Sequence, residues 1–301
     1  MQLFGSILEV LIGGLFSGVL YSLVALGFVL IFKASGVFNF AQGAMVLFAG
    51  LALVRAIEFM PLPLAFLFAG ALMVALAFVI ERLVLRPLVN QPAIILFMAT
   101  IGIAFFLDGL GQSIFGSDAY PLNVGIPKNA IFLGEKTFPG GILINAFDVW
   151  AAVVAGLLVA GLALFFQKTR IGMALRAVAD DHQAAQSVGI PLNHIWVIVW
   201  AVAGLVALVA GTIWGSKLGV QFSIAQVALK ALPALILGGF TSVPGAIVGG
   251  LIIGAGEKLA EVFGGPYLGG GIENWFAFML ALAFLLFRPQ GLFGERIIER
   301  V

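Results

Sequence analysis

The chain has 301 residues, of which 62% are hydrophobic and only 10% are charged, and its mean hydropathy is +1.17. A soluble domain carries about 25% charged residues, so this composition excludes a water-soluble protein. The net charge of +1 and the lack of any long basic block argue against nucleic-acid binding through phosphates. The absence of cysteine excludes disulfides and cysteine-ligated metal sites.

The hydrophobic runs are unbroken and about 20 residues long, which predicts membrane-spanning helices rather than the short alternating strands of a β-barrel. Nine segments stand out, at 7–32, 37–57, 62–80, 93–115, 148–166, 195–215, 226–239, 244–263 and 273–287. The seventh is short and holds Pro233, so one re-entrant pair with eight crossings is the alternative to nine. We therefore expect an all-α polytopic membrane helix bundle that forms one transmembrane domain over residues 1–301.

The loops alternate in charge along the chain. Nine of the fifteen Lys and Arg residues lie at Lys33, in the 81–92 loop, in the 167–194 loop and in the tail, where the net charge is +4. The rest of the chain has a net charge of −3. Because Lys and Arg gather in cytoplasmic loops, this pattern predicts a cytoplasmic 167–194 loop and C-terminus. The N-terminus and the 116–147 loop are then expected outside.

An internal repeat appears when the sequence is shifted by 184 residues. Residues 27–44 then align with residues 211–228, with six identities: Gly27/Gly211, Lys33/Lys217, Phe38/Phe222, Ala41/Ala225, Gln42/Gln226 and Ala44/Ala228. The spans before Lys33 and Lys217 are predicted to cross in opposite directions, so the repeat is inverted. Broken helices at matching positions of inverted repeats meet near the midplane and mark a transport path.

Polar side chains stand in these predicted spans, where hydrocarbon offers them no partner. Asn39, Gln42 and Gln226 are expected either to line a translocation path or to hydrogen-bond between helices, at about 0.6 kcal/mol each. In both interpretations they do not face lipid. Asp108, inside 93–115, is a further candidate for the path because a buried carboxylate is costly. It would otherwise lie near the outer headgroups or pair with a neighbouring helix.

The eighth segment combines glycines with charged residues. Glu257, Lys258 and Glu261 are interpreted as a solvated helix end at the outer side. The spacings Gly245-x3-Gly249 and Gly250-x3-Gly254 predict close helix packing, with a hinge as the alternative.

The 167–194 loop is predicted to contain a helix over about 172–188. Arg176 and Asp180 are spaced to pair on its surface, and Gly189 and Pro191 are expected to end it. One side of this helix is expected to be smooth, because it consists of the small residues Ala177, Ala184, Ala185 and Val188. Such a helix suits either docking to another protein or a solvated connection.

Three stretches carry a resemblance to a known family. GLFSGVLYSLVALGFVLIFKASGVFNFAQGA, ALRAVADDHQAAQSVGI and ALILGGFTSVPGAIVGGLIIGAGE resemble signature regions of permeases that import branched-chain amino acids, the LivH type. Within the second stretch, Gln183-Ala184-Ala185-x-x-x-Gly189 is similar to the EAA…G loop of bacterial ABC importer permeases, with Gln in place of Glu. The resemblance covers nearly the whole chain, and the urea permeases look alike in parts.

The resemblance implies a multi-pass subunit of the bacterial cytoplasmic (inner) membrane that forms the translocation path. Its implied partners are a second, LivM-like permease subunit, two ATP-binding subunits and a periplasmic solute-binding protein. The 172–189 helix would be the coupling helix on an ATPase. The residues implied in that contact are Arg176, Asp180, Asp181, Gln183, Ala184, Ala185 and Gly189.

The dipeptide Gly-Lys, which a phosphate-binding P-loop needs, is absent from the sequence. We therefore expect no cofactor on this chain, with ATP and Mg²⁺ bound by partner ATPases, and no enzymatic activity of its own. Two other functions stay open. One is an ABC permease for urea or short amides, and the other is an ion-coupled secondary transporter.

Overall fold

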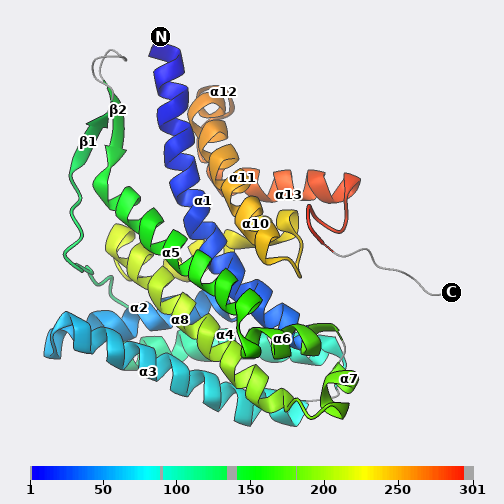
Figure 1. The fold of residues 1–301 in the computed structure, drawn as a ribbon. Coiled ribbons are helices and arrows are strands. Elements are labelled where there is room, and N and C mark those ends of the chain that lie inside the picture. Colours follow the sequence, from blue (N-terminus) through cyan, green and yellow to red (C-terminus); the bar gives the residue numbers. More distant parts are fainter. Residues whose placement is uncertain (1, 89–90, 134–140, 181, 295–301) are drawn as a thin grey trace. The chain divides into compact units, whose positions relative to one another are not determined.

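The computed structural model describes all residues except 1, 89–90, 134–140, 181 and 295–301 (Figure 1). The chain divides into two compact units. Unit 1 comprises Met1–Ala25, Gly125–Val159 and Lys230–Val301, and unit 2 comprises Leu26–Val124 and Ala160–Leu229. The long helices α1 (Gln2–Ser35) and α5 (Ala146–Lys168) contribute residues to both units.

Unit 2 is a helical bundle built around α2 (Gln42–Phe59). The helices α3 (Leu62–Ile80), α4 (Ala93–Phe115), α8 (Leu192–Leu218) and α9 (Ser223–Leu229) all pack against it. Every residue of α2 from Gln42 to Val54 is buried. This burial follows from a sequence whose first three turns hold no charge, so the helix can be surrounded on all sides.

Glycine allows α2 to lie very close to the two helices that carry the second copy of the repeat. A Cβ atom on Gly211 of α8 would lie 2.4 Å from the carbonyl oxygen of Val46. A Cβ atom on Gly43 of α2 would lie 2.5 Å from the carbonyl oxygen of Ala225 in α9. Backbone contact of this kind excludes any larger residue at both positions.

The remaining elements of unit 2 extend its helices. α3 continues through a π-helical turn (Glu81–Leu85) and a 3₁₀ turn (Arg86–Leu88). Two shorter helices, α6 (Arg170–Asp180) and α7 (His182–Ser187), connect α5 to α8.

Unit 1 contains α10 (Ala231–Gly238), α11 (Val243–Leu259) and α13 (Phe276–Phe287), which pack on one another. α11 starts at the N-cap Ser242, whose hydroxyl accepts a hydrogen bond from the Gly245 amide, as a helix N-terminus requires. It continues through a π-helical turn (Ala260–Gly264) into α12 (Gly265–Leu268).

The region predicted as an external loop contains an antiparallel hairpin in unit 1. Strands β1 (Ala130–Leu133) and β2 (Ile142–Asn145) pair from Ala130↔Asn145 to Leu133↔Ile142, and β2 leads directly into α5 (Figure 1). Part of the turn between them, 134–140, lies outside the described residues. The side of the membrane that holds this hairpin stays a prediction.

The predicted helical membrane bundle is confirmed, and all nine predicted segments coincide with helices. Six described helices are long and apolar enough to cross a membrane. Ser223–Gly238 and Val243–Leu268 meet that test only as a pair, bent by 117° at the break between them, which brings the number to seven. α13 is a shorter apolar helix. The predicted eight or nine segments are therefore all present, but fewer of them are long enough to cross a membrane as single helices. The seventh segment is divided into α9 and α10, because the helix breaks at Lys230 and Pro233 follows in the first turn of α10.

The two glycine spacings of the eighth segment act as packing surfaces on different neighbours within unit 1. Gly245 and Gly249 face α10, where a Cβ atom on Gly249 would lie 2.2 Å from the carbonyl oxygen of Ala234. Gly250 and Gly254 face α1, where a Cβ atom on Gly254 would lie 2.4 Å from the carbonyl oxygen of Gly14. The expected close packing is confirmed, while a hinge stays a prediction.

We predict that Gly254→Ala lowers the unfolding free energy of the purified protein by roughly 1–3 kcal/mol, because the methyl group must push α1 away from α11. Gly13→Ala is the matched control, since a Cβ atom there meets nothing within 4 Å. The control should keep or raise stability because alanine favours helix. Thermal unfolding in detergent measures both variants, and equal midpoints would contradict the packing described for unit 1.

Candidate functional site

Two of the predicted amide side chains form a closed network in unit 2. Asn39 and Gln42 are both 0% exposed, and the Asn39 amide nitrogen donates to Gln42 Oε1 at 3.3 Å. The Gln42 amide nitrogen donates to the carbonyl oxygen of Ala203 in α8 at 3.3 Å. Asn39 Oδ1 accepts from the Ala41 amide at 3.1 Å. The network therefore ties the loop before α2 to α8 and gives both amides the partners that lipid lacks.

The same loop is also held by α4. The amide nitrogen of Phe40 donates to Thr100 Oγ1 at 3.1 Å, and Thr100 is 1% exposed. Thr100 Oγ1 in turn lies 3.2 Å from the carbonyl oxygen of Phe38. Gly36, at φ +69°, makes the turn out of α1 that brings these residues back into the bundle.

The last turns of α1 and the first half of α8 run antiparallel within unit 2. The indole nitrogen of Trp196 donates to the carbonyl oxygen of Ala34 at 3.2 Å. This hydrogen bond places the start of α8 beside the end of α1. At the other end, the Gln42 amide that bonds Ala203 fills the space beside Gly27, where a Cβ atom would lie 2.5 Å from Gln42 Nε2. The corresponding helices of the two repeat copies therefore point in opposite directions, as the inverted repeat predicts.

The repeat partner of Gln42 has a different environment. Gln226 lies on α9 with its side chain exposed, while its neighbours Ile224 and Ala228 are buried. The two glutamines therefore share a sequence position but not a role within this chain. Whether Asn39, Gln42 and Gln226 line the translocation path stays a prediction.

Asp108 is a half-buried carboxylate in α4. Its Oδ1 atom is buried and has no hydrogen-bond partner among the described residues. An unpartnered carboxylate oxygen within an apolar helix keeps Asp108 a candidate for the path, and the proposed pairing with a neighbouring helix is not seen in the described part of the chain.

A second polar cluster, in unit 1, was missed by the sequence analysis. Glu257 of α11 is 2% exposed and Tyr21 of α1 is 4% exposed, and the tyrosine hydroxyl donates to Glu257 Oε1 at 3.1 Å. The ammonium nitrogen of Lys230 lies 3.6 Å from the same oxygen. A lysine inside the predicted seventh segment was the available signal, because a charge within a span needs a partner.

The interpretation of Glu257 as part of a solvated helix end is therefore wrong. Lys258 and Glu273 do form a partly exposed ion pair, with 2.8 Å between Nζ and Oε2, and Glu261 accepts hydrogen bonds from the backbone of Gly271 and Glu273. Glu257 points instead toward α1, where it accepts the hydrogen bond from Tyr21.

The connection between α5 and α8 is helical, as predicted, but consists of two helices. α7 ends in a Schellman motif, in which Gly189 (φ +87°) donates to the Gln186 carbonyl and Ile190 donates to the Ala185 carbonyl, both at 3.0 Å. The expected end of the helix at Gly189 is confirmed. Ala185 is 2% exposed, whereas Val188 is 75% exposed.

The polar contacts expected in this connection are only partly described. Arg176 donates to the carbonyl oxygen of Phe166 rather than projecting freely. Asp181 lies outside the described residues, as do the side chains of Asp180 and Gln183, so the predicted pair of Arg176 with Asp180 is not tested. Ala184 is exposed.

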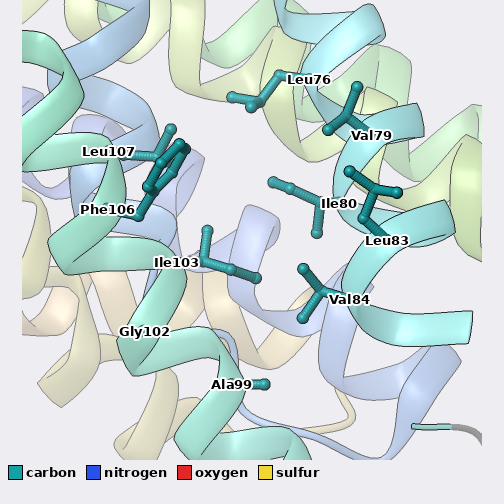
Figure 2. A pocket seen from close by; sticks show the side chains of 10 residues that line it. All are labelled: Leu76, Val79, Ile80, Leu83, Val84, Ala99, Gly102, Ile103, Phe106 and Leu107. Atoms are coloured by element: carbon teal, nitrogen blue, oxygen red, sulfur yellow. The ribbon is translucent and has the colours of Figure 1, made fainter. Parts of the chain in front are cut away.

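The groove between α3 and α4 is a further cavity, of about 410 Å³. Figure 2 shows that the side chains of Ile80, Ile103 and Phe106 are directed into it from the two helices. All of its lining residues are apolar or glycine. Such a cavity offers no group to orient a polar ligand, so it does not by itself form a site for an amino acid or an amide.

Comparison with known proteins places this arrangement in a family. The family model described as "Branched-chain amino acid transport system / permease component" matches residues 10–287. The chain belongs to this permease family. The permease is 32% identical to the high-affinity branched-chain amino acid transport system permease protein BraD of Pseudomonas aeruginosa, over 98% of both chains.

Two further relatives are similar over nearly their full length. The permease is 28% identical to the corresponding protein LivH of Escherichia coli K12, over 98% of this chain and 97% of the relative. It is 30% identical to a probable branched-chain amino acid transport permease protein LivH of Methanocaldococcus jannaschii, over 95% of this chain and 92% of the relative. The family predicted from the three sequence stretches is thus confirmed.

The repeat-related glutamines of the permease provide a matched test of the buried network. We predict that Gln42→Leu lowers the unfolding free energy by roughly 1–3 kcal/mol, because Asn39 loses its amide partner inside the bundle. Gln226→Leu should change it by no more than about 0.5 kcal/mol, since that side chain is exposed. Thermal or denaturant unfolding in detergent checks both, and equal losses would contradict the difference in burial.

Proposed function

We propose that this chain is the transmembrane subunit of an ATP-driven importer for branched-chain or related amino acids. The observation that carries the proposal is the family match over residues 10–287, together with relatives named for branched-chain amino acid transport along nearly the whole chain. The structure supports it with a polytopic helical fold in which Asn39, Gln42 and Glu257 are buried.

Energy for transport would come from other chains. The sequence holds no P-loop, so ATP and Mg²⁺ would be bound by two partner ATP-binding subunits. The connection formed by α6 and α7 is the proposed docking element, because it joins two long helices and presents exposed small and apolar side chains at Ala184 and Val188. Motion of an ATPase would then reach α5 and α8 directly.

The other proposed partners are a second permease subunit and a periplasmic solute-binding protein. The distribution of Lys and Arg supports a cytoplasmic C-terminus and α6–α7 connection, with the N-terminus and the β1–β2 hairpin on the periplasmic side of the inner membrane. A binding protein would deliver the amino acid to that outer side.

We propose that α9 borders the translocation path. Its exposed Gln226 would be costly against lipid, so a polar path or the partner permease suits it better. Asn39 and Gln42 lie within the same unit and would support this face through α2, which contacts α9 at Gly43 and Ala225. Asp108 stays a candidate for the same path.

The two alternative functions are an ABC permease for urea or short amides and an ion-coupled secondary transporter. An ion-coupled transporter needs a titratable cluster in the membrane, and Tyr21, Lys230 and Glu257 form such a cluster in unit 1.

Reconstitution decides among these functions. The permease, a second permease subunit and two ATP-binding subunits are placed in liposomes with the solute-binding protein and radiolabelled leucine. We expect uptake only when both ATP and the binding protein are present. Uptake by this chain alone, driven by an ion gradient, would contradict the proposal, and uptake of urea without leucine would favour the amide permease.

The docking element generates a separate prediction. Val188→Asp and Ala184→Asp should reduce copurification of the ATP-binding subunits by about 10-fold or more, because a charge is desolvated in an apolar contact. Both side chains are exposed, so the fold should persist. Ala185→Asp is unsuitable because Ala185 is buried and the variant would test folding instead.

The matched control is Ser117→Asp, an exposed position in the predicted external region. It should copurify with the ATP-binding subunits like the unaltered chain. Normal copurification of the Val188 and Ala184 variants would rule out docking through α7.

A further inference from the structure

The charged cluster of unit 1 leaves one carboxylate oxygen unused. The Tyr21 hydroxyl and the Lys230 ammonium both approach Glu257 Oε1, at 3.1 Å and 3.6 Å. Glu257 Oε2 is buried and has no hydrogen-bond partner among the described residues. Buried polar atoms in proteins are nearly always hydrogen-bonded, so this oxygen marks a place for a donor that the described residues do not supply.

Lys230 is the part of the cluster that a ligand can reach from the surface of the chain. Its side chain is 19% exposed, while that of Glu257 is 3% exposed. An ammonium group has three N–H donors, and the contact with Glu257 Oε1 uses only one direction. Lys230 can therefore bind an anionic group at the surface of unit 1, while the Glu257 carboxylate lies more deeply buried beside it.

Lys230 and Glu257 lie far from the ends of their apolar segments, as the residues of a transport site would. Lys230 lies at the middle of the apolar segment Ser223–Gly238, where the chain passes from α9 to α10. Glu257 lies near the middle of the next segment, Val243–Leu268, about 20 Å along it from Val243. Ionisable groups at such positions are costly and often mark substrate or ion sites, and transporters commonly place these sites at breaks in membrane helices.

We propose that Lys230 and Glu257 bind the charged end of an α-amino acid during transport, which rests on the proposed function and deepens it. The ammonium group of the substrate donates to Glu257 Oε2, and its carboxylate accepts from Lys230 Nζ. A zwitterion brings one charge of each sign, so the net charge inside the unit is unchanged when it enters. The contact between Lys230 and Glu257 Oε1 is kept, and two pairs with the substrate are added.

A purely structural ion pair predicts a different behaviour. Replacing both partners of a buried pair by neutral residues of similar size is often neutral for stability or raises it. A structural role of Lys230 and Glu257 would therefore tolerate the double neutral variant, whereas a binding role would not.

The experiment uses the complete importer in liposomes with radiolabelled L-leucine as the probe. We expect Lys230→Met combined with Glu257→Gln to keep the amount of assembled complex and its midpoint of thermal unfolding. Leucine uptake should fall by at least about 30-fold, because two charge-assisted hydrogen bonds to the substrate are lost. Uptake within about twofold of the unaltered importer would overturn the proposal.

The matched control removes the neighbouring ion pair between Lys258 of α11 and Glu273 of the 3₁₀ turn Ile272–Asn274. Lys258→Met combined with Glu273→Gln takes away a pair with 2.8 Å between Nζ and Oε2 and with side chains 39% and 33% exposed. We expect its uptake to stay within about twofold, because an exposed pair contributes little and no substrate contact is assigned to it. A loss as large as that of the Lys230 and Glu257 variant would overturn the assignment.

A second variant keeps the proposal testable if the double neutral variant does not assemble. In Lys230→Arg the charge is kept, and the guanidinium can bond both carboxylate oxygens and thus occupy Oε2. A binding role predicts loss of uptake at an unchanged or raised unfolding midpoint. Normal uptake by this variant would contradict a binding role.

The transport function and the binding role of Lys230 and Glu257 can fail separately. If the unaltered importer takes up no leucine with ATP and binding protein, the proposed function fails and the assignment of Lys230 and Glu257 fails with it. If the unaltered importer works and both variants work equally well, only the assignment fails.

Discussion

Every polar group within the membrane segments of this chain must find its partner inside the protein, because hydrocarbon supplies none. Among the described residues, each unit holds one polar cluster that meets this constraint across helices for most of its atoms. In unit 2 the amides of Asn39 and Gln42 bond each other and the backbone of α8. In unit 1 the carboxylate of Glu257 is held by Tyr21 and Lys230.

Glycine makes both polar clusters possible. At Gly27 the missing side chain leaves the space that the Gln42 amide fills, and at Gly250 and Gly254 it lets α1 and α11 touch through their backbones. Helices that approach this closely contact each other through their backbones, and such close packing at small residues is a common basis of helix association in a membrane. The polar groups beside them are then enclosed without any large side chain to separate them from their partners.

Much of this could be predicted from the sequence, and what could not has physical reasons. The helical segments, the Gly189 helix end and the close glycine packing follow from local pattern. The burial of Glu257 does not, because a charge near a helix end is solvated or enclosed according to what the neighbouring helix places there. The same holds for Gln42 and Gln226, which share a repeat position but differ in burial, and for Ala185, which is buried within a loop that looks exposed.

The central claim is that polar side chains at membrane depth face the interior or a polar path and never lipid. Because the chain has no cysteine, Gln226→Cys introduces the one thiol of this subunit, whose labelling in the assembled importer can be followed with a membrane-impermeant thiol reagent and with a lipid-phase reagent. Val153→Cys, at an exposed apolar position of α5, serves as the lipid-facing reference. The account predicts that the impermeant reagent modifies position 226 and not position 153. Modification of position 226 by the lipid-phase reagent alone would contradict it.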